Sequence, residues 1–343
     1  MAHERVRLKD IAQVYGCSIN TVSKALHDSE ELPESTRNKI KQLAKEMGYI
    51  QNRQASSLRS GRSHIVAVIV YDIQNAYFSA LISEMELSLR QAGYDALILC
   101  SQTSITEKEH GIEMIQVALS LSVDGIIYFP YWTDYKTIQF LNKSHVPFVL
   151  VSHWLPEVNV DIVRCDDYQG GRLAAAHLVS LGHRKFVYIA GPVNNSAQYD
   201  REKGFREVLY SAGVKPEDIY LISSEQWEET NANGDIITLL QPQTYKAIFA
   251  FNDNVAYQIM VEFRKAGIRV PEDISLIGCD HIARTIHYLD SLTSVACDDK
   301  YSLARESVQV LLNRIQEPEI PPVTRILPVR LYDGNTTRKP EMM

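Results

Sequence analysis

The sequence predicts an α/β protein that begins with a small all-α domain and continues as two subdomains built on parallel sheets. Apolar residues recur at helical spacing over roughly the first fifty positions. From residue 63 onward, short apolar runs alternate with helical stretches, which is typical of parallel sheets covered by helices on both faces. A chain of 343 residues is long enough for two or three domains, each with a sizeable core.

The first two predicted helices lie within residues 7–27 and are joined by a tight turn. Gly16 stands where the first helix must stop, since glycine accepts the left-handed backbone of such a turn. Ser18 is expected to cap the second helix with its hydroxyl. The buried face of the first helix is expected to comprise Leu8, Ile11, Ala12 and Val14. Val22, Ala25 and Leu26 would then face it from the second helix.

A third amphipathic helix is predicted over residues 35–49, and Gly48 ends it. Two helices at a steep angle, the second with short polar side chains near its N-terminus, form the geometry that enters a DNA major groove. An ordinary helical hairpin would produce the same pattern, so the first two helices alone leave both interpretations open.

Charge is divided unevenly along the chain. Residues 1–62 hold eleven Lys and Arg against seven Asp and Glu, a net charge of +4, whereas the whole chain carries −7 and the remainder therefore −11. A basic N-terminal part on an acidic body is suited to contact with nucleic-acid phosphates. A solvated charged surface could also explain +4, but it explains poorly why residues 51–62 contain three arginines and no acid.

This array resembles the headpiece and hinge of the LacI/GalR transcription repressors. The matching stretches are LKDIAQVYGCSINTVSKAL, TRNKI and GYIQNRQASSLRSGRS. The resemblance implies that Ile19, Asn20 and Lys24 read base edges, with Asn20 suited to adenine, Lys24 to guanine and Ile19 to a thymine methyl group. Thr21 and Ser23 are expected to contact phosphate or to cap the helix locally.

Residues 51–62 are expected to form the hinge helix of this headpiece. By resemblance, Leu58 wedges into one base step of the minor groove, and Ala55 is small enough for two hinge helices to approach closely. The segment has no apolar stripe and is too short to be stable alone, so we expect it to order only in a DNA-bound homodimer. Packing of Leu58 against its own domain is the alternative.

Beyond the hinge, the sequence predicts two sets of strands. The first set spans residues 65–71, 94–99, 125–129 and 147–151, and the second spans 185–190, 219–222, 247–251 and 274–278. Intervening helices are expected over residues 80–92, 170–181, 201–212 and 255–266. Two such sets predict two doubly wound subdomains with a cleft at the carboxyl ends of their strands. The sequence has neither Gly-x-Gly-x-x-Gly nor a Walker motif, so no nucleotide cofactor is expected.

This part also resembles the same family and, through it, the periplasmic sugar-binding proteins. Matching stretches include VAVIVYDIQNAYF, CDDYQGGRLAAAHLVSLGHRKFVYIAGP, AIFAFNDNVA and VPEDISLIGCD, and the resemblance as a whole runs from residue 7 to about 333. It implies three chain crossings between the subdomains, near residues 164, 293 and 326. The expected organisation is a headpiece at 1–50, a hinge at 51–62, a first effector-core subdomain at 63–164 and 294–325, and a second at 165–293 and 326–339.

Seven residues are expected to bind an effector in the cleft: Tyr77, Phe78, Asp166, Arg201, Trp227, Asn252 and Asp280. By resemblance, Arg201 holds two ligand oxygens, Asp280 accepts from hydroxyls or ring N–H groups, and Trp227 lies against an apolar ligand face. Structural alternatives are a core position for Phe78 and helix N-caps at Asp167 and Asp253. The family commonly carries a second acid after residue 280, and here that position is His281, so ligand identity does not carry over.

The five cysteines, at positions 17, 100, 165, 279 and 297, show no paired spacing. Cys100, Cys165 and Cys279 end or adjoin apolar runs, so buried reduced thiols are expected, and no metal site is expected because cysteines and histidines do not cluster. The chain has no apolar run of the length that spans a membrane and no apolar signal region at its start. These features predict a cytoplasmic protein.

Taken with the resemblance, the residues predict a dimeric transcription regulator, a repressor of a pseudo-palindromic operator controlled by a small molecule in the cleft. A sugar-like effector fits Arg, Asp, Asn and Trp around one cleft, and the alternatives are a nucleobase co-repressor or a protein partner. An enzyme would need a nucleophile–base pair or a metal cluster, and the histidines at 153, 177, 281 and 287 are dispersed. A transport-binding protein would have no use for residues 7–60, so we expect neither activity.

Overall fold

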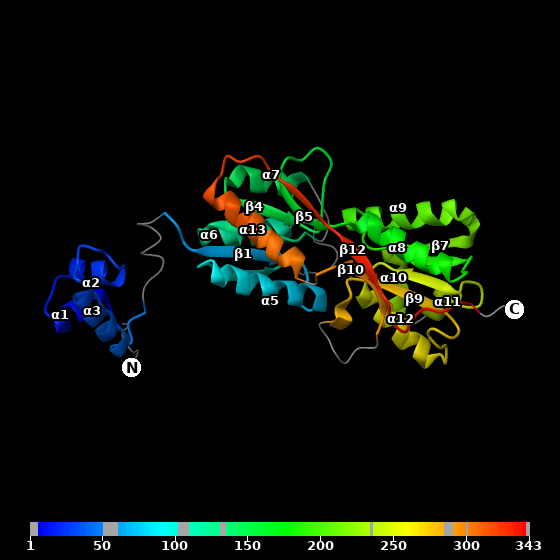
Figure 1. Ribbon diagram of the computed structural model, residues 1–343, viewed down its shortest axis with the longest axis horizontal. Helices are drawn as coiled ribbons and strands as arrows, with labels where there is room; N and C mark the ends of the chain where they lie inside the picture. Colours follow the sequence, from blue (N-terminus) through cyan, green and yellow to red (C-terminus); the bar gives the residue numbers. More distant parts are fainter. Residues whose placement is uncertain are drawn as a thin grey trace. The chain divides into compact units, whose positions relative to one another are not determined.

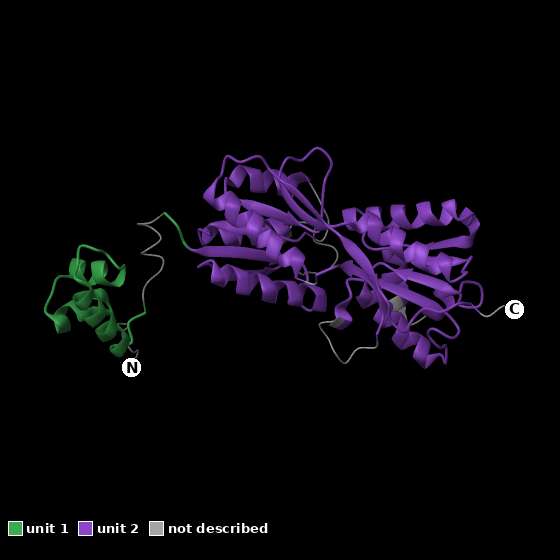
Figure 2. Ribbon diagram, viewed as in Figure 1, with its two compact units in different colours: residues 1–63 green, residues 64–343 purple. Residues whose placement is uncertain are grey.

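The computed structural model describes residues 6–50, 61–101, 110–130, 135–233, 236–284, 291–299 and 301–340. The chain divides into two compact units, residues 1–63 and 64–343 (Figure 2). Ala55 and Leu58 of the predicted hinge lie outside the described residues.

The N-terminal unit contains three helices, α1 (Leu8–Tyr15), α2 (Ile19–Leu26) and α3 (Glu34–Glu46). One small core joins them, made of Ile11, Ala12, Val22, Ala25, Ile40 and Ala44. Gly16 has φ 78° after α1, and the Ser18 hydroxyl accepts from the Thr21 backbone N–H at 3.1 Å at the start of α2. The predicted turn between the first two helices is therefore confirmed.

Val14 was expected in the buried face of α1, and this is wrong. Its side chain is 63% exposed, while Tyr15 packs against the core instead. Positions 8, 11, 12 and 15 follow the i, i+3, i+4, i+7 pattern of one helical face, and position 14 falls beside that face.

The first sheet of the C-terminal unit has the strand order β11-β5-β4-β3-β1-β2, and every neighbouring pair is parallel. Its strands are β1 (Ile65–Val70), β2 (Asp95–Cys100), β3 (Gly125–Tyr128), β4 (Phe148–Val151), β5 (Asp161–Cys165) and β11 (Thr324–Leu327). Helices α5 (Ala76–Gln91) and α13 (Ser302–Gln316) cover one face, and α6 (His110–Ser120) and α7 (Tyr135–Ser144) cover the other (Figure 1). We call this the first subdomain.

The second sheet has the order β12-β10-β9-β8-β6-β7, in which only the β10–β12 pair is antiparallel. Its strands are β6 (Phe186–Ile189), β7 (Ile219–Ile222), β8 (Ala247–Ala250), β9 (Ser275–Cys279), β10 (Thr293–Cys297) and β12 (Val329–Tyr332). One face carries α8 (Asp167–Ser180) and α9 (Ser196–Ser211); the other carries α10 (Ser224–Asn233), α11 (Ile236–Leu240) and α12 (Asp253–Lys265). Short 3-10 turns occupy Pro216–Asp218 and Ile282–Arg284. We call this the second subdomain.

The predicted α/β class with two doubly wound sheets is confirmed, and each of the eight predicted strands ends within one residue of an observed strand. The four predicted helices of the core begin two to five residues earlier than expected. Polar caps explain the difference: Asn75, Asp166, Asn195 and Asn252 each accept a backbone N–H with the side chain just before a helix. The caps are therefore Asp166 and Asn252, not Asp167 and Asp253.

The chain crosses between the two subdomains after Cys165, after Cys297 and at Pro328. The second crossing was expected near residue 293, but β10 continues to Cys297 because it pairs with β9 and β12. The third was expected near residue 326, but β11 pairs with β5 of the first sheet as far as Leu327. The expected subdomain boundaries at 293/294 and 325/326 are corrected accordingly.

A disulfide joins Cys165 to Cys297, with their Cα atoms 6.4 Å apart. The expectation of a reduced thiol at Cys165 is therefore wrong, because two strand ends far apart in sequence meet where the subdomains join. Cys17, Cys100 and Cys279 carry free thiols, and only Cys279 of these is buried.

Candidate functional site

A cavity in the C-terminal unit is lined by residues from both subdomains. The carboxyl ends of β4, β5, β8, β9 and β10 reach it, as do the first turns of α5, α8 and α9. Parallel strands end at one edge of their sheet, so two sheets facing each other bring these ends together. Six of the seven predicted effector residues line this cavity: Tyr77, Phe78, Asp166, Arg201, Asn252 and Asp280.

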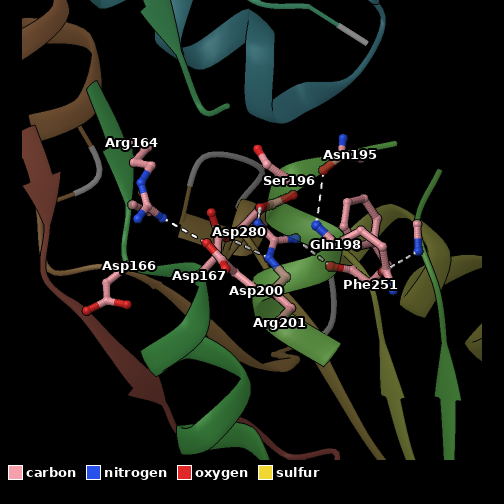
Figure 3. A network of polar contacts seen from close by, with 12 residues as sticks. Arg164, Asp166, Asp167, Asn195, Ser196, Gln198, Asp200, Arg201, Phe251 and Asp280 are labelled. Carbon is pink, nitrogen blue, oxygen red and sulfur yellow. Dashed lines mark hydrogen bonds and ion pairs between the residues drawn. The ribbon is translucent and has the colours of Figure 1, made fainter. Parts of the chain in front are cut away.

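Arg201 of α9 lies between two carboxylates at the polar side of the cavity (Figure 3). Its Nε donates to Asp167 Oδ1 at 2.8 Å, and its Nη2 lies 3.7 Å from Asp280 Oδ1. Nη1 donates to the Phe251 carbonyl at 2.6 Å, and the guanidinium carbon lies 4.8 Å from the centroid of the Phe251 ring. Arg201 is only 9% exposed, so these partners compensate a charge that would otherwise be costly to bury.

Two glycines allow α8 and α9 to pack closely enough to place Arg201. A Cβ at Gly171 would lie 2.0 Å from the Arg201 carbonyl oxygen, and one at Gly204 would lie 2.1 Å from the Tyr168 carbonyl oxygen. Both contacts are shorter than any side chain tolerates, and both are with backbone, which has little room to move. The two helix backbones therefore touch directly, and α9 presents Arg201 to Asp167 at the start of α8.

Asp280 follows β9 with φ 105°, a left-handed backbone region that favours glycine. Its N–H donates to the Val295 carbonyl at 2.8 Å, which holds the loop against β10. A non-glycine residue kept in such a conformation is characteristic of binding sites, where the surroundings compensate the strain. In this conformation, the Asp280 carboxylate faces the Arg201 guanidinium.

Protonation states follow from burial around this arginine. Burial and the charge of Asp280 raise the pKa of Tyr77, so its phenol keeps its proton at neutral pH. Burial, assisted by the positive charge of Arg201, lowers the pKa of His153 to about 3, so its imidazole is neutral. Burial also raises the pKa of Asp167, and Arg201 opposes this shift.

The cavity therefore combines hydrogen-bond donors and acceptors with an aromatic wall. Tyr71, Phe78 and Phe251 supply the wall. Phe78 also packs into the core of the first subdomain, which is the alternative that the sequence left open for this residue. Asp166 and Asn252 line the cavity although each also caps a helix. Among the described residues, no group of three His, Cys, Asp or Glu side chains could hold a metal ion.

Trp227, the seventh predicted effector residue, does not belong to the lining of this cavity. Its side chain is 5% exposed and packs in the core of the second subdomain with Ile222 and Ile236. Helix α10 buries this residue against the sheet, so the expected aromatic contact with a ligand is corrected to a core position.

Sequence reasoning missed a polar cluster that joins the two subdomains, which we call the latch: Trp154, Arg164, Ser196 and Asp200. The Trp154 indole N–H donates to Asp200 Oδ2 at 2.8 Å. Arg164 Nη1 donates to the same oxygen at 3.0 Å (Figure 3). The Trp154 backbone N–H donates to Ser196 Oγ at 2.9 Å. Asp200 precedes Arg201, yet its partners are 36 and 46 residues away in sequence, so no local pattern signals the contact.

The N-terminal unit presents the predicted base-reading residues on α2. Ile19 is 52% exposed, and Asn20 is also exposed. Lys24 forms an ion pair with Glu31, and the Thr21 and Ser18 hydroxyls lie 2.9 Å apart in the local cap. Ser23 is half-buried in the middle of the helix. These positions are compatible with the predicted contacts to DNA, which remain predictions.

Comparison with known proteins gives a consistent picture. Residues 7–52 match the model of bacterial regulatory proteins of the lacI family, and residues 175–337 match that of a periplasmic binding protein-like domain. The HTH-type transcriptional regulator DegA of Bacillus subtilis (strain 168) is 32% identical over 295 residues, which are 85% of this chain and 86% of DegA.

Solved structures agree with this picture. A LacI family transcriptional regulator from Enterococcus faecalis V583 with bound ribose is 28% identical, with TM-score 0.70 over 81% of this chain and 100% of that chain. The lac repressor dimer bound to operator and the anti-inducer ONPF has the same fold, with 24% identity and TM-score 0.83 over 98% of this chain and 100% of that one.

The described part of the chain has no helix long and apolar enough to cross a membrane. The similarity to DegA extends over both units, and the family model matches the helices that the sequence analysis singled out. The chain belongs to the lacI family of bacterial regulatory proteins.

Proposed function

We propose that this protein is a transcriptional repressor that binds a pseudo-palindromic operator as a homodimer, and that a sugar-like effector in the cavity controls its affinity for DNA. One observation carries the proposal. The same chain holds a lacI-type headpiece and, in its other unit, a cavity lined from two subdomains with Arg201 between Asp167 and Asp280. The proposed activity is binding, and the protein is not an enzyme.

Sequence reading is assigned to α2. Ile19 and Asn20 project into solvent, where they can meet a thymine methyl group and an adenine edge. Lys24 would leave its ion pair with Glu31 and donate a hydrogen bond to the edge of a guanine. Thr21 and Ser23 would contact phosphates or cap the helix locally. Ala55 and Leu58 are assigned to the minor groove, where two chains of a homodimer would meet.

Effector recognition is assigned to the six cavity residues. Arg201 and Asp280 offer complementary charge-assisted hydrogen bonds, and the Tyr77 phenol, Asp166 and Asn252 add donors and acceptors. Phe78 provides an apolar face. A compact polyhydroxylated ring matches this mixture, and the ribose bound in the Enterococcus faecalis relative supports a sugar. A nucleobase is the alternative outcome of the test below, and a protein partner is favoured if none of the small molecules raises the melting temperature.

Control of DNA binding by the effector follows from the fact that both subdomains line the cavity. A ligand that contacts both subdomains favours one angle between them, and the first subdomain carries residue 64, where the N-terminal unit attaches. A coupling free energy of about 1–3 kcal/mol would change operator affinity roughly 5–150-fold. Because the proposed target is chromosomal DNA of a bacterium, we place the protein in the cytoplasm.

Selection of genomic fragments by the full-length protein, followed by footprinting, tests DNA recognition directly. We expect a footprint with two-fold symmetry and retention that falls steeply with salt. Absence of any preferred fragment would overturn the operator assignment.

A thermal-shift screen of sugars, sugar phosphates and purines against the full chain then identifies the effector class, since a bound ligand raises the melting temperature by mass action. We expect a sugar to give the largest shift and to change operator affinity at fixed salt by about fivefold or more. If a purine gives the largest shift, the effector is a nucleobase and not a sugar. Identical DNA affinity with the cavity occupied and empty would overturn effector control.

A further inference from the structure

The disulfide between Cys165 and Cys297 lies where the two subdomains are joined. Cys165 is the last residue of β5, and Cys297 is the last residue of β10. A crossing between the subdomains follows each of them directly, so the bond links two crossings that are 132 residues apart in sequence. Both cysteines also line the cavity.

The third crossing lies beside the other two. The Asp166 N–H donates to the Leu327 carbonyl at 2.9 Å, and the Asp298 N–H donates to the Pro328 carbonyl at 3.3 Å. Any rotation of one subdomain on the other must be absorbed by backbone torsions in these three short segments. A covalent bond between two of them removes their independent movement.

The bond is not needed to build either core. Each sheet is covered on both faces by its own helices, and four clusters of buried apolar residues account for this packing. Disulfides that persist in a reducing cytoplasm are uncommon, and those that form there are chiefly catalytic or redox-sensing. A disulfide at a joint between two complete subdomains therefore fits a regulatory role better than a structural one.

We propose that Cys165 and Cys297 form a reversible thiol–disulfide switch that restricts opening of the effector cavity. The oxidant is a small-molecule disulfide such as oxidised glutathione. The Cys165 thiolate, which is the more accessible of the two, attacks one sulfur of that disulfide and releases one small thiolate, leaving a mixed disulfide on Cys165. Cys297 loses its proton and attacks Cys165 Sγ, which releases the second small thiolate. Two protein thiols are oxidised, and one small disulfide is reduced to two thiols.

The two oxidation states differ in how freely the cavity opens. In the reduced protein, the crossings after Cys165 and Cys297 move separately, so the latch between Trp154 and Asp200 can break as the subdomains rotate. In the oxidised protein, the range of rotation between the two subdomains is smaller, so the hydrogen bonds of the latch stay formed for longer. The cytoplasmic setting that favours a regulatory role and the link from cavity opening to operator affinity both rest on the proposed function, whereas the chemistry of the switch does not.

The first test counts thiols in the full-length protein after equilibration over a series of ratios of reduced to oxidised glutathione. Maleimide labelling of the denatured protein should report five thiols at the reducing end and three at the oxidising end, since the chain has five cysteines and two form the bond. Cys165→Ser and Cys297→Ser should each abolish this intramolecular transition. Cys100→Ser, a free and half-buried cysteine elsewhere, is the matched control and should retain it. A wild-type count that stays at five overturns the proposal.

The second test measures amide hydrogen exchange around the Trp154 N–H, which donates across the cleft to Ser196. We expect exchange there to be about tenfold slower in the oxidised protein than in the reduced one, and unchanged by oxidant in Cys165→Ser. Equal exchange in both oxidation states overturns the effect on opening. Neither test uses DNA or effector, so their failure leaves the proposed function standing, and failure to bind an operator leaves the switch standing.

Discussion

The guanidinium of Arg164, in β5, donates to the Asp200 carboxylate of α9 at 3.0 Å and so ties one subdomain of the effector core to the other. The two side chains are 16% and 11% exposed, which places the pair in a largely desolvated position. The Trp154 indole reaches the same carboxylate oxygen, so one acceptor of the second subdomain is shared by two donors of the first. Breaking this contact should therefore loosen the joint.

Asp200→Asn removes the charge while keeping the size of the side chain. We expect it to lower the free energy of unfolding by about 1.5–3 kcal/mol, the range for hydrogen bonds to charged groups, because Arg164 is left buried without its counter-charge. Urea denaturation measures this loss. Glu207→Gln on the same helix is the matched control: its ion pair with Arg172 is much more exposed and should be worth about 0–1 kcal/mol. If both variants lose the same free energy of unfolding, the latch contributes no more to stability than an exposed ion pair does.

Arg201→Lys keeps the positive charge but loses the planar fork that reaches two acceptors. The loss of one charge-assisted hydrogen bond, worth ~1.5–3 kcal/mol, should weaken binding of the ligand with the largest thermal shift by roughly 10–150-fold. Isothermal titration calorimetry measures the change. Arg206→Lys, one turn along α9 and paired with Glu202, should leave the affinity unaltered. If both variants bind equally, Arg201 is not a ligand contact.

His153 should make the fold sensitive to mild acid. Its pKa is about 3 in the folded protein, against an ordinary value of 6.5, so the unfolded chain binds the extra proton throughout the interval between them. The free energy of unfolding must then fall as pH drops below 6.5, by up to about 1.4 kcal/mol per pH unit. Full stability from this group is present above pH 6.5.

Denaturation curves at pH 7.5 and pH 5.5 for the wild type and His153→Gln measure this effect. The variant should lose less stability between the two values than the wild type does. His145→Gln, at an exposed histidine just before β4, is the comparison variant. A wild type and a His153→Gln variant with parallel pH profiles would contradict the assignment.

Leu58→Ala tests the proposed wedge in the minor groove. We expect it to weaken binding to the selected operator by about tenfold or more while leaving the ligand-induced thermal shift intact, since unstacking a base step requires an apolar side chain. Fluorescence anisotropy with labelled operator at constant salt measures the affinity. Unaltered operator binding would exclude the wedge.

Much of the fold could be predicted because buried parallel strands are continuous apolar runs. The strands that escaped prediction are β5, β10, β11 and β12, in which charged or hydroxyl side chains interrupt the apolar run. β5 contains Asp161 and Arg164, and Asp161 is buried because Arg314 donates to it at 2.8 Å from 153 residues away. β11 and β12 each contain an arginine, Arg325 and Arg330 respectively. A charge that is buried inside a strand needs such a distant partner, which a linear pattern does not reveal.

The candidate site was predicted to a similar extent and for a similar reason. Motifs located Arg201, Asp280 and Asn252 because each follows a short sequence signature. The Cys165–Cys297 bond and the contacts of Asp200 join segments that are distant in the chain, so no signature marks them. Trp227 was assigned to the site but lies in the core of the second subdomain. An aromatic side chain can pack against a ligand or inside a core, and the sequence does not distinguish the two.

The last two strands complete both sheets within a few residues of each other. β11 pairs with β5 at the edge of the first sheet, and β12 pairs with β10 at the edge of the second. During translation, neither edge can be covered until the ribosome has made the stretch from Thr324 to Tyr332. A nascent chain halted before that stretch leaves β5 and β10 at the sheet edges in place of the short, arginine-bearing β11 and β12, and such unprotected edges invite pairing with other chains. Premature termination near the 3′ end of the message would therefore yield aggregation-prone fragments instead of one intact subdomain.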